Sequence, residues 1–242
     1  MILKALAGTL ILWLSSAAFA EAESPINLSV YGNFKRMIHA GDVSGKIDLT
    51  SIPCSAGTYA VGALANLQGE ILVWDGHVLI TPGESISGST QPPGVNEQAA
   101  LLVSAQVKEW EQTQVLHDMR QKEFEQFVID SARSKCIDTR KPFPFIMMGE
   151  ITDYTWHVVT GVAKRHGGAT QHQQGHPSNR TFSGAETKGK LLGFYSAEEL
   201  EGVISHPGEH FHVHYADDNL KISGHLDTFG VRKGATLLLP KQ

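Results

Sequence analysis

Four histidines lie close together in one segment near the C-terminus, PGEHFHVHYADDNLKISGHLDTF, which runs from Pro207 to Phe229. Three of them, His210, His212 and His214, are separated by single residues. Because alternate side chains of a strand point to the same face, a strand at this place would present a row of imidazoles. Imidazole is a common zinc ligand, so the spacing indicates metal chemistry.

A hairpin brings a further histidine to this row. The turn-forming residues 217–219 are followed by a short second strand that contains His225. If the chain turns about Asn219–Leu220, His214 pairs with His225, and directly paired Cβ atoms lie roughly 4.5–5.5 Å apart. His212 lies on the same face and completes a set of three.

Three protein ligands leave a fourth position open on a tetrahedral zinc ion, which is typical of catalytic sites. The alternative is that these histidines are solvated strand residues or hydrogen-bonded groups of the core. Spacing alone leaves both readings open.

The first 20 residues have the pattern of a secretory signal peptide. Lys4 gives the charged start, residues 5–14 are apolar, and Ala18 and Ala20 form a small-residue cleavage site. We therefore expect residues 21–242 to form the mature protein, which would be periplasmic or secreted and not held in a membrane. Its balance of 19 basic and 25 acidic residues argues against a nucleic-acid partner.

The chain has two cysteines, Cys54 and Cys136. Export permits a disulfide between them. Two free, buried thiols are the alternative, and the sequence does not separate the two.

Short strands dominate the pattern of apolar residues. Asp75 and Gly76 predict a hairpin between strands at 70–74 and 77–80. Further strands are expected at 99–107, 145–148, 155–162, 191–195 and 231–239. The sequence predicts an α+β chain with largely antiparallel or mixed sheets, two-domain-like, and a few helices.

Two helices are predicted. Apolar residues recur at threes and fours over 113–134. A capping box formed by Ser196 and Glu199 predicts a second helix that leads toward the histidine hairpin. Residues 163–187 are polar and glycine-rich, which indicates a solvated loop; a metal-binding loop is the alternative, because this segment contains His166, His172 and His176.

In the order and spacing of its motifs, nearly the whole mature chain resembles the acetolactate decarboxylases. The motifs are Tyr31-Gly32, Gly41-Asp42, Gly57-Thr-Tyr, Gly69-Glu70 before Asp75-Gly76, EFEQFV at 123–128, Gly193-Phe194-Tyr195-Ser196, His212-Val-His214 and Ser223-Gly224-His225.

This resemblance implies a two-domain sheet protein that holds Zn²⁺ with His212, His214 and His225. It implies that Glu70 acts near the reacting carbon as general acid or base, although the same residue by itself would read as a solvent-facing position at a strand start. The implied substrate is a 2-hydroxy-3-keto acid such as 2-acetolactate, and the implied product is acetoin. The resemblance also allows a homodimer.

The chain departs from the family pattern at two positions. An arginine that meets the substrate carboxylate in the family falls at His157 here. A second glutamate beyond the last metal histidine has no counterpart before Gln242. His157 or Arg165 is expected to substitute for the arginine. The departures keep two alternatives open, namely a zinc hydrolase or lyase with another substrate, and an exported metal- or ligand-binding protein without turnover.

Overall fold

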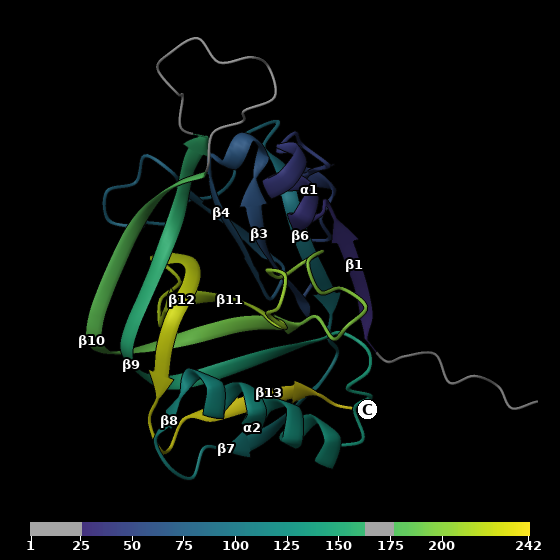
Figure 1. The fold of residues 1–242 in the computed structure, drawn as a ribbon, viewed down its shortest axis with the longest axis vertical. Helices are drawn as coiled ribbons and strands as arrows, with labels where there is room; N and C mark the ends of the chain where they lie inside the picture. The colour runs from purple at the N-terminus through teal and green to yellow at the C-terminus, as the bar shows by residue number, and fades with distance from the viewer. Residues whose placement is uncertain (1–25, 163–176) are drawn as a thin grey trace, which may run out of the picture.

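The computed structural model describes residues 26–162 and 177–242, which form two β-sheets and two α-helices (Figure 1). Every strand pairing in these ranges is antiparallel. The predicted α+β class with largely antiparallel sheets is confirmed. The signal peptide predicted at 1–20 lies outside the described residues.

The first sheet has six strands in the order β1-β6-β3-β4-β5, with β2 paired to β6. Its strands are β1 (Asn27–Tyr31), β2 (Ile47–Asp48), β3 (Thr58–Leu64), β4 (Gly69–Trp74), β5 (His77–Pro82) and β6 (Gln98–Gln106). Asp75 and Gly76 both have positive φ, 51° and 82°, as the predicted tight hairpin between β4 and β5 requires.

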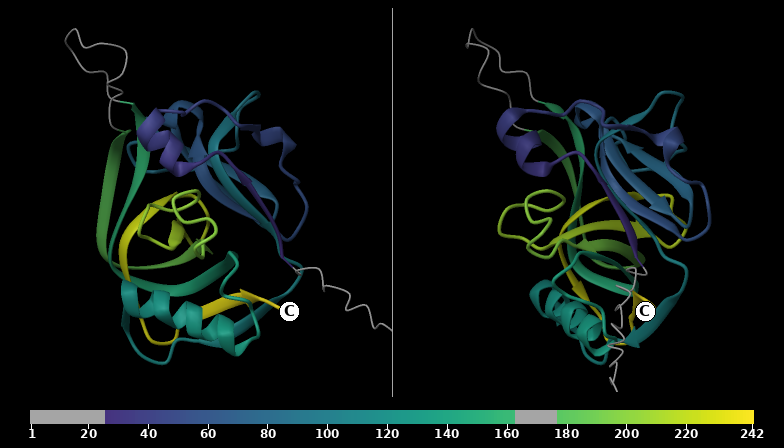
Figure 2. Two further views of the ribbon diagram at one scale, coloured as in Figure 1. Left: turned by 45° about the vertical axis from the view of Figure 1, so that its right-hand side comes forward. Right: turned by 90° about the vertical axis from the view of Figure 1, so that its right-hand side faces the viewer.

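The second sheet has seven strands in the order β7-β13-β9-β10-β11-β12-β8. They are β7 (Trp110–Gln114), β8 (Met119–Arg120), β9 (Phe143–Val162), β10 (Pro177–Tyr195), β11 (Phe211–Asp217), β12 (Ser223–Val231) and β13 (Thr236–Pro240). One edge of the long strand β9 pairs with β10, and the other pairs with β13 and β12. Strands β9, β10, β11 and β12 therefore close into a ring, visible around the middle of Figures 1 and 2.

Apolar side chains join the two sheets. Val61, Leu72 and Val103 of the first sheet belong to the same buried cluster as Ile146 and Leu192 of the second. Helix α2 (Gln121–Ser134) covers the far side of the second sheet, where Phe124 and Val128 are fully buried. Helix α1 (Phe34–Ala40) packs beside the first sheet (Figure 2).

Several predicted boundaries are wrong. The helix predicted from 113 begins only at Gln121, because residues 110–114 and 119–120 pair as strands β7 and β8. The strand predicted at 231–239 is interrupted by a turn in which Gly234 has φ of 92°. The strands predicted at 145–148 and 155–162 are one strand, β9, and the second half of the predicted loop at 163–187 belongs to β10.

The helix predicted after Ser196 is also wrong, because residues 197–204 form turns. Ala197 has φ of 49°, which a right-handed helix excludes. The hydroxyl of Ser196 contacts the hydroxyl of Ser205 and the carbonyl oxygen of its own neighbour, so it does not cap a helix.

Cys54 and Cys136 are both free and exposed. Cys54 precedes strand β3 of the first sheet, whereas Cys136 lies between helix α2 and strand β9 of the second sheet. The structure therefore contains neither of the two alternatives that the sequence left open, a disulfide or two buried thiols. None of the described helices combines the length and the apolar character that crossing a membrane requires.

Candidate metal centre

Three histidines stand side by side across neighbouring strands of the ring. His214 on β11 pairs with His225 on β12, as the predicted hairpin turn requires, and His225 pairs in turn with His157 on β9. Directly opposed residues of antiparallel strands project from the same face. Gly224 makes the close approach of β12 to β9 possible, because a Cβ atom at this position would lie 2.5 Å from the carbonyl oxygen of His157.

The predicted ligands His212, His214 and His225 come together. One ring nitrogen from each lies within 4.8 Å of those of the other two. The centroids of the rings are 5.0 to 5.6 Å apart. Among residues 26–162 and 177–242, these three histidines are the one group of three or more His, Cys, Asp or Glu side chains that could hold a metal ion.

Three of the six nitrogens of these rings have no hydrogen-bond partner. Both ring nitrogens of His214, which is fully buried, and Nδ1 of His212 make no hydrogen bond. A buried polar atom without a partner is costly, and coordination of a metal ion would satisfy it. The donor set therefore fits a divalent ion such as zinc.

Burial also keeps these imidazoles in the ligating form. It lowers the pKa of His212 to about 4, and it lowers the pKa values of His214 and His225 well below their ordinary value. The neighbouring histidines reinforce the effect on His214 and His225. Because metal ligation requires neutral imidazole, the site is ready to bind an ion at neutral pH.

Glu70 reaches the histidines from the other sheet. Its side chain is 4% exposed, and its Oε2 lies 3.7 Å from Nε2 of His214. Its Oε1 accepts a hydrogen bond of 3.1 Å from the backbone N–H of Val159 on β9. Burial raises the pKa of Glu70 to about 7, although the charge of His157 opposes this rise. Glu70 is therefore a buried carboxyl group that can exchange a proton near neutral pH, not a solvent-facing residue.

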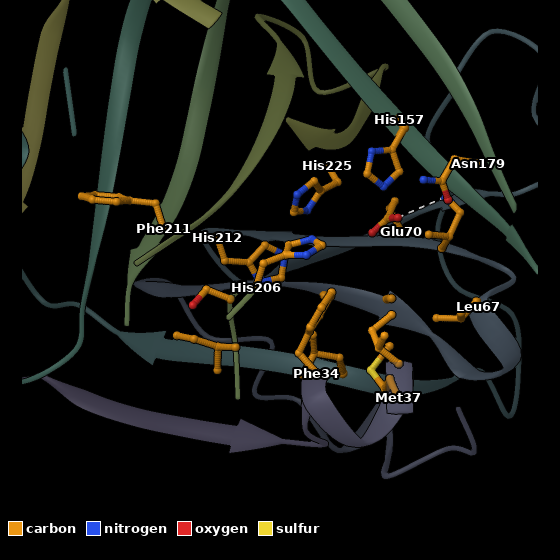
Figure 3. Close-up of a pocket in the computed structure, with 17 residues that line it drawn as sticks. Phe34, Met37, Leu67, Glu70, His157, Asn179, His206, Phe211, His212 and His225 are labelled. Atoms are coloured by element: carbon orange, nitrogen blue, oxygen red, sulfur yellow. Dashed lines mark hydrogen bonds between the residues drawn. The ribbon is translucent and has the colours of Figure 1, made fainter. Parts of the chain in front are cut away.

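His157 stands next to Glu70 and His225 in Figure 3. Its ring centroid is 4.9 Å from that of His225, and its Nδ1 lies 2.7 Å from Oδ1 of Asp227. Burial lowers the pKa of His157, but the hydrogen bond with Asp227 and the charges of Glu70 and Asp227 outweigh burial and raise it above the ordinary value.

A cavity of about 120 Å³ opens beside Glu70, His157, His212 and His225 (Figure 3). Its remaining wall is mainly apolar and includes all five buried members of one hydrophobic cluster, Met37, Ala63, Leu67, Leu101 and Val159, together with Phe34. The cavity therefore has a polar side made of ionisable groups and an apolar side opposite.

A second, polar cavity of about 290 Å³ shares His206, Phe211 and His225 with the first. Lys122, Glu125 and Asp227 are among its other lining residues. Two cavities of different character therefore meet at His206 and His225.

Some functional candidates from the sequence do not join this centre, and others were missed. His210 lines the polar cavity, where its Nδ1 lies 3.2 Å from the carbonyl oxygen of Ala197. Arg165 and the histidines of the polar loop lie outside the described residues. The sequence reasoning missed Asp227 and His206. Asp227 follows the predicted ligand His225 by two residues, which could have marked it as a site residue. Its hydrogen bond with His157 could not be predicted, because the two residues are 70 positions apart.

The sequence matches the family model of the alpha-acetolactate decarboxylases over residues 32–239. The fold is similar to that of the alpha-acetolactate decarboxylase of Bacillus subtilis strain 168, with a TM-score of 0.70 at 14% identity over 89% of this chain and 86% of that one. A protein of unknown function from Staphylococcus aureus, described as similar to alpha-acetolactate decarboxylase, gives a TM-score of 0.66 at 15% identity with the same coverage. No curated protein sequence matches the chain.

The family match, over residues 32–239, makes the protein a carboxy-lyase that acts on a small molecule. The chain belongs to the alpha-acetolactate decarboxylase family.

Proposed function

We propose that this chain is an exported, zinc-dependent enzyme that decarboxylates 2-acetolactate, or a closely related 2-hydroxy-3-keto acid, to acetoin or its analogue. The observation that carries the proposal is the meeting of three imidazoles, two of them buried, with a buried carboxyl group at one small cavity, which Glu70, His212 and His225 line.

His212, His214 and His225 would hold the zinc ion and leave a position open toward the cavity. Three nitrogen ligands with an open fourth position are typical of catalytic zinc. An ion held there supplies a Lewis acid that stabilises negative charge on oxygen atoms of the substrate.

Glu70 is proposed as the proton donor. When CO₂ leaves, the bonding electrons stay on the former α-carbon, and a proton from Glu70 must replace the lost carboxyl group. The N–H of Val159 occupies Oε1, which leaves Oε2, on the side of His214, to carry the proton. In the metal-free protein the pKa of this carboxyl is about 7, near the operating pH at which a general acid works best. Water then restores the proton on Glu70.

His157 is proposed to bind the substrate carboxylate in place of the family's arginine. It lies on the polar side of the cavity, next to Glu70, and Asp227 supports it. A single imidazole is a weaker carboxylate partner than the two-pronged guanidinium of arginine. We therefore expect weaker substrate binding than an arginine would give at this position.

The cavity supports a small substrate. Its volume of about 120 Å³ admits a compact molecule of a few heavy atoms, and its apolar side, formed around Met37 and Leu67, suits the alkyl groups of a 2-hydroxy-3-keto acid. A mildly acidic surface, with 25 acidic against 20 basic residues in the full chain, gives no support to a nucleic-acid partner. We also propose that the protein is a homodimer, which a measurement of the molecular mass of the purified protein in solution would test.

Metal analysis of the purified protein, followed by an assay of acetoin formation from racemic acetolactate, tests the proposal. We expect about one zinc ion per chain and measurable turnover. His157→Ala should raise KM, whereas His77→Ala, a change at an exposed histidine on β5, should alter neither KM nor metal content. One bound ion without turnover of acetolactate would support the metal centre but not the proposed substrate, and would favour an enzyme with another substrate or a binding protein.

A further inference from the structure

Strand β12 contains an irregularity next to the metal centre. His225 and Leu226 pair with consecutive residues of β9, His157 and Trp156, but Asp227 has no partner, and Thr228 pairs with the next residue of β9. One extra residue on β12 is the signature of a β-bulge. Such a bulge changes the direction in which a side chain points, and bulges occur often beside active sites.

Asp227, the extra residue of the bulge, contacts His157 rather than a strand partner of its own. In a regular ladder, Asp227 would lie two residues beyond the partner of His157 and opposite another residue of β9. Its Oδ1 instead lies 2.7 Å from Nδ1 of His157, the shortest spacing expected for a charge-assisted bond. The His157 ring is 14% exposed and the Asp227 side chain is 34% exposed, so the pair is shielded on one side only.

The pair also connects the two cavities. His157 lines the smaller, mainly apolar cavity, and Asp227 lines the polar cavity on the other side. Because Nδ1 of His157 is engaged by Asp227, the other ring nitrogen, Nε2, is the one left for a ligand of the inner cavity. A carboxylate accepts hydrogen bonds only, so Nδ1 must carry a proton whatever the state of Nε2.

We propose that Asp227, carried on this bulge, is a positioning residue: by accepting the Nδ1–H of His157 it fixes the orientation of the ring, so that Nε2 points into the inner cavity, where an Nε2–H donates to the substrate carboxylate. The part that concerns the substrate rests on the proposed function. An imidazole that is held at one ring nitrogen presents its other nitrogen in a fixed direction.

The first test reads the tautomer directly in metal-free protein by ¹⁵N NMR of labelled histidines. The His157 signal is identified by its loss in His157→Gln. We expect a protonated Nδ1 in the wild type and in Asp227→Asn, whose amide oxygen still accepts the bond. In Asp227→Ala, His157 should revert to the mixture of tautomers seen for an exposed histidine such as His77. An unchanged His157 tautomer in Asp227→Ala would overturn the proposal.

The second test separates positioning from a merely structural role in the zinc-loaded enzyme. Asp227→Ala should lower kcat/KM by about 10- to 100-fold, mainly through KM, with the zinc content unchanged. Asp227→Asn should recover most of this loss. Asp218→Ala, at an exposed position in the turn of the same hairpin, is the matched control and should leave kcat/KM unchanged.

The two tests distinguish failure of the proposed function from failure of the positioning role of Asp227. If the wild type does not turn over acetolactate, the proposed function fails, and the tautomer measurement still decides whether Asp227 positions His157. If turnover is present but Asp227→Asn loses as much kcat/KM as Asp227→Ala, the hydrogen bond is not what matters and the positioning role is refuted. Loss of zinc in Asp227→Ala would likewise contradict it, since Asp227 would then support the metal ligands.

Discussion

Replacing Glu70 with Gln is expected to make the metal-free protein more stable at alkaline pH. The pKa of this carboxyl rises from 4.5 to about 7 on folding because the side chain is buried. A raised pKa means that folding favours the protonated form, so the contribution of Glu70 to stability is fully present below about pH 4.5 and is lost as the pH rises through 7. The pKa difference corresponds to about 3 kcal/mol.

The Glu70→Gln variant does not lose this stability as the pH rises. Its side chain is neutral at every pH, and its amide oxygen still accepts the hydrogen bond from the N–H of Val159. The variant should therefore match the wild type near pH 4.5 and exceed its free energy of unfolding by about 3 kcal/mol near pH 9. Glu70 does not contribute to the pKa shifts of His212, His214 and His225, so these histidines cancel in the comparison. His157 does not cancel, because the charge of Glu70 helps to raise its pKa and the variant lacks that charge.

The assay is urea unfolding of chelator-treated protein at several pH values between 4.5 and 9. Glu84→Gln, at an exposed position after β5, serves as the control and should follow the wild type. In the metal-loaded protein, Glu70→Gln should lower turnover by about 10²–10⁴-fold with the metal content unchanged. Parallel pH dependences of stability for the wild type and Glu70→Gln would refute the reasoning, because they would mean that the folded state does not perturb this carboxyl.

Four further outcomes are expected. His214→Ala should abolish stoichiometric metal binding, measured by metal analysis, and full occupancy would exclude the three-histidine centre. Metal-free Glu70→Gln protein, which lacks the opposing effect of the carboxyl group, should lose stability as the pH falls below 6.5, because burial lowers the pKa of His212 to about 4. This residue alone contributes on the order of 3 kcal/mol, seen as a falling urea midpoint. Met37→Ala, which enlarges the apolar side of the cavity, should raise kcat/KM for substrates with one added methylene relative to acetolactate by about 10-fold, and equal ratios would remove Met37 from substrate selection. Protein recovered from its native host should begin at Glu21, as N-terminal sequencing would show, and an intact Met1 would contradict export.

The hairpin of the metal centre could be predicted from the sequence because its determinants are local. Alternation of histidines with apolar residues sets the face, and turn-forming residues set the register that pairs His214 with His225. Asp217 closes this turn, since its Oδ1 accepts the backbone N–H groups of Lys221 and Ile222. The structure of a short hairpin with turn-forming residues can be predicted from its residue types, because the turn is stabilised by local contacts.

The remainder of the site depends on contacts between distant segments. The bond between His157 and Asp227 joins residues 70 positions apart, and Asp227 lies at a bulge that interrupts the pairing of β12 with β9. The capping-box pattern at Ser196 was misleading for the same kind of reason. The tertiary contact between Ser196 and Ser205 and the left-handed backbone of Ala197 override a local helix signal.

The division of the site between two sheets has a consequence for how activity appears during folding. The three imidazoles belong to one hairpin, whereas Glu70 arrives from β4 and is fixed by Val159, 89 residues later in the chain. Contacts between distant residues form later than local ones. A newly folding chain can therefore capture its ion before the carboxyl group is in place, so that in refolding experiments the signal for bound metal precedes the recovery of enzyme activity.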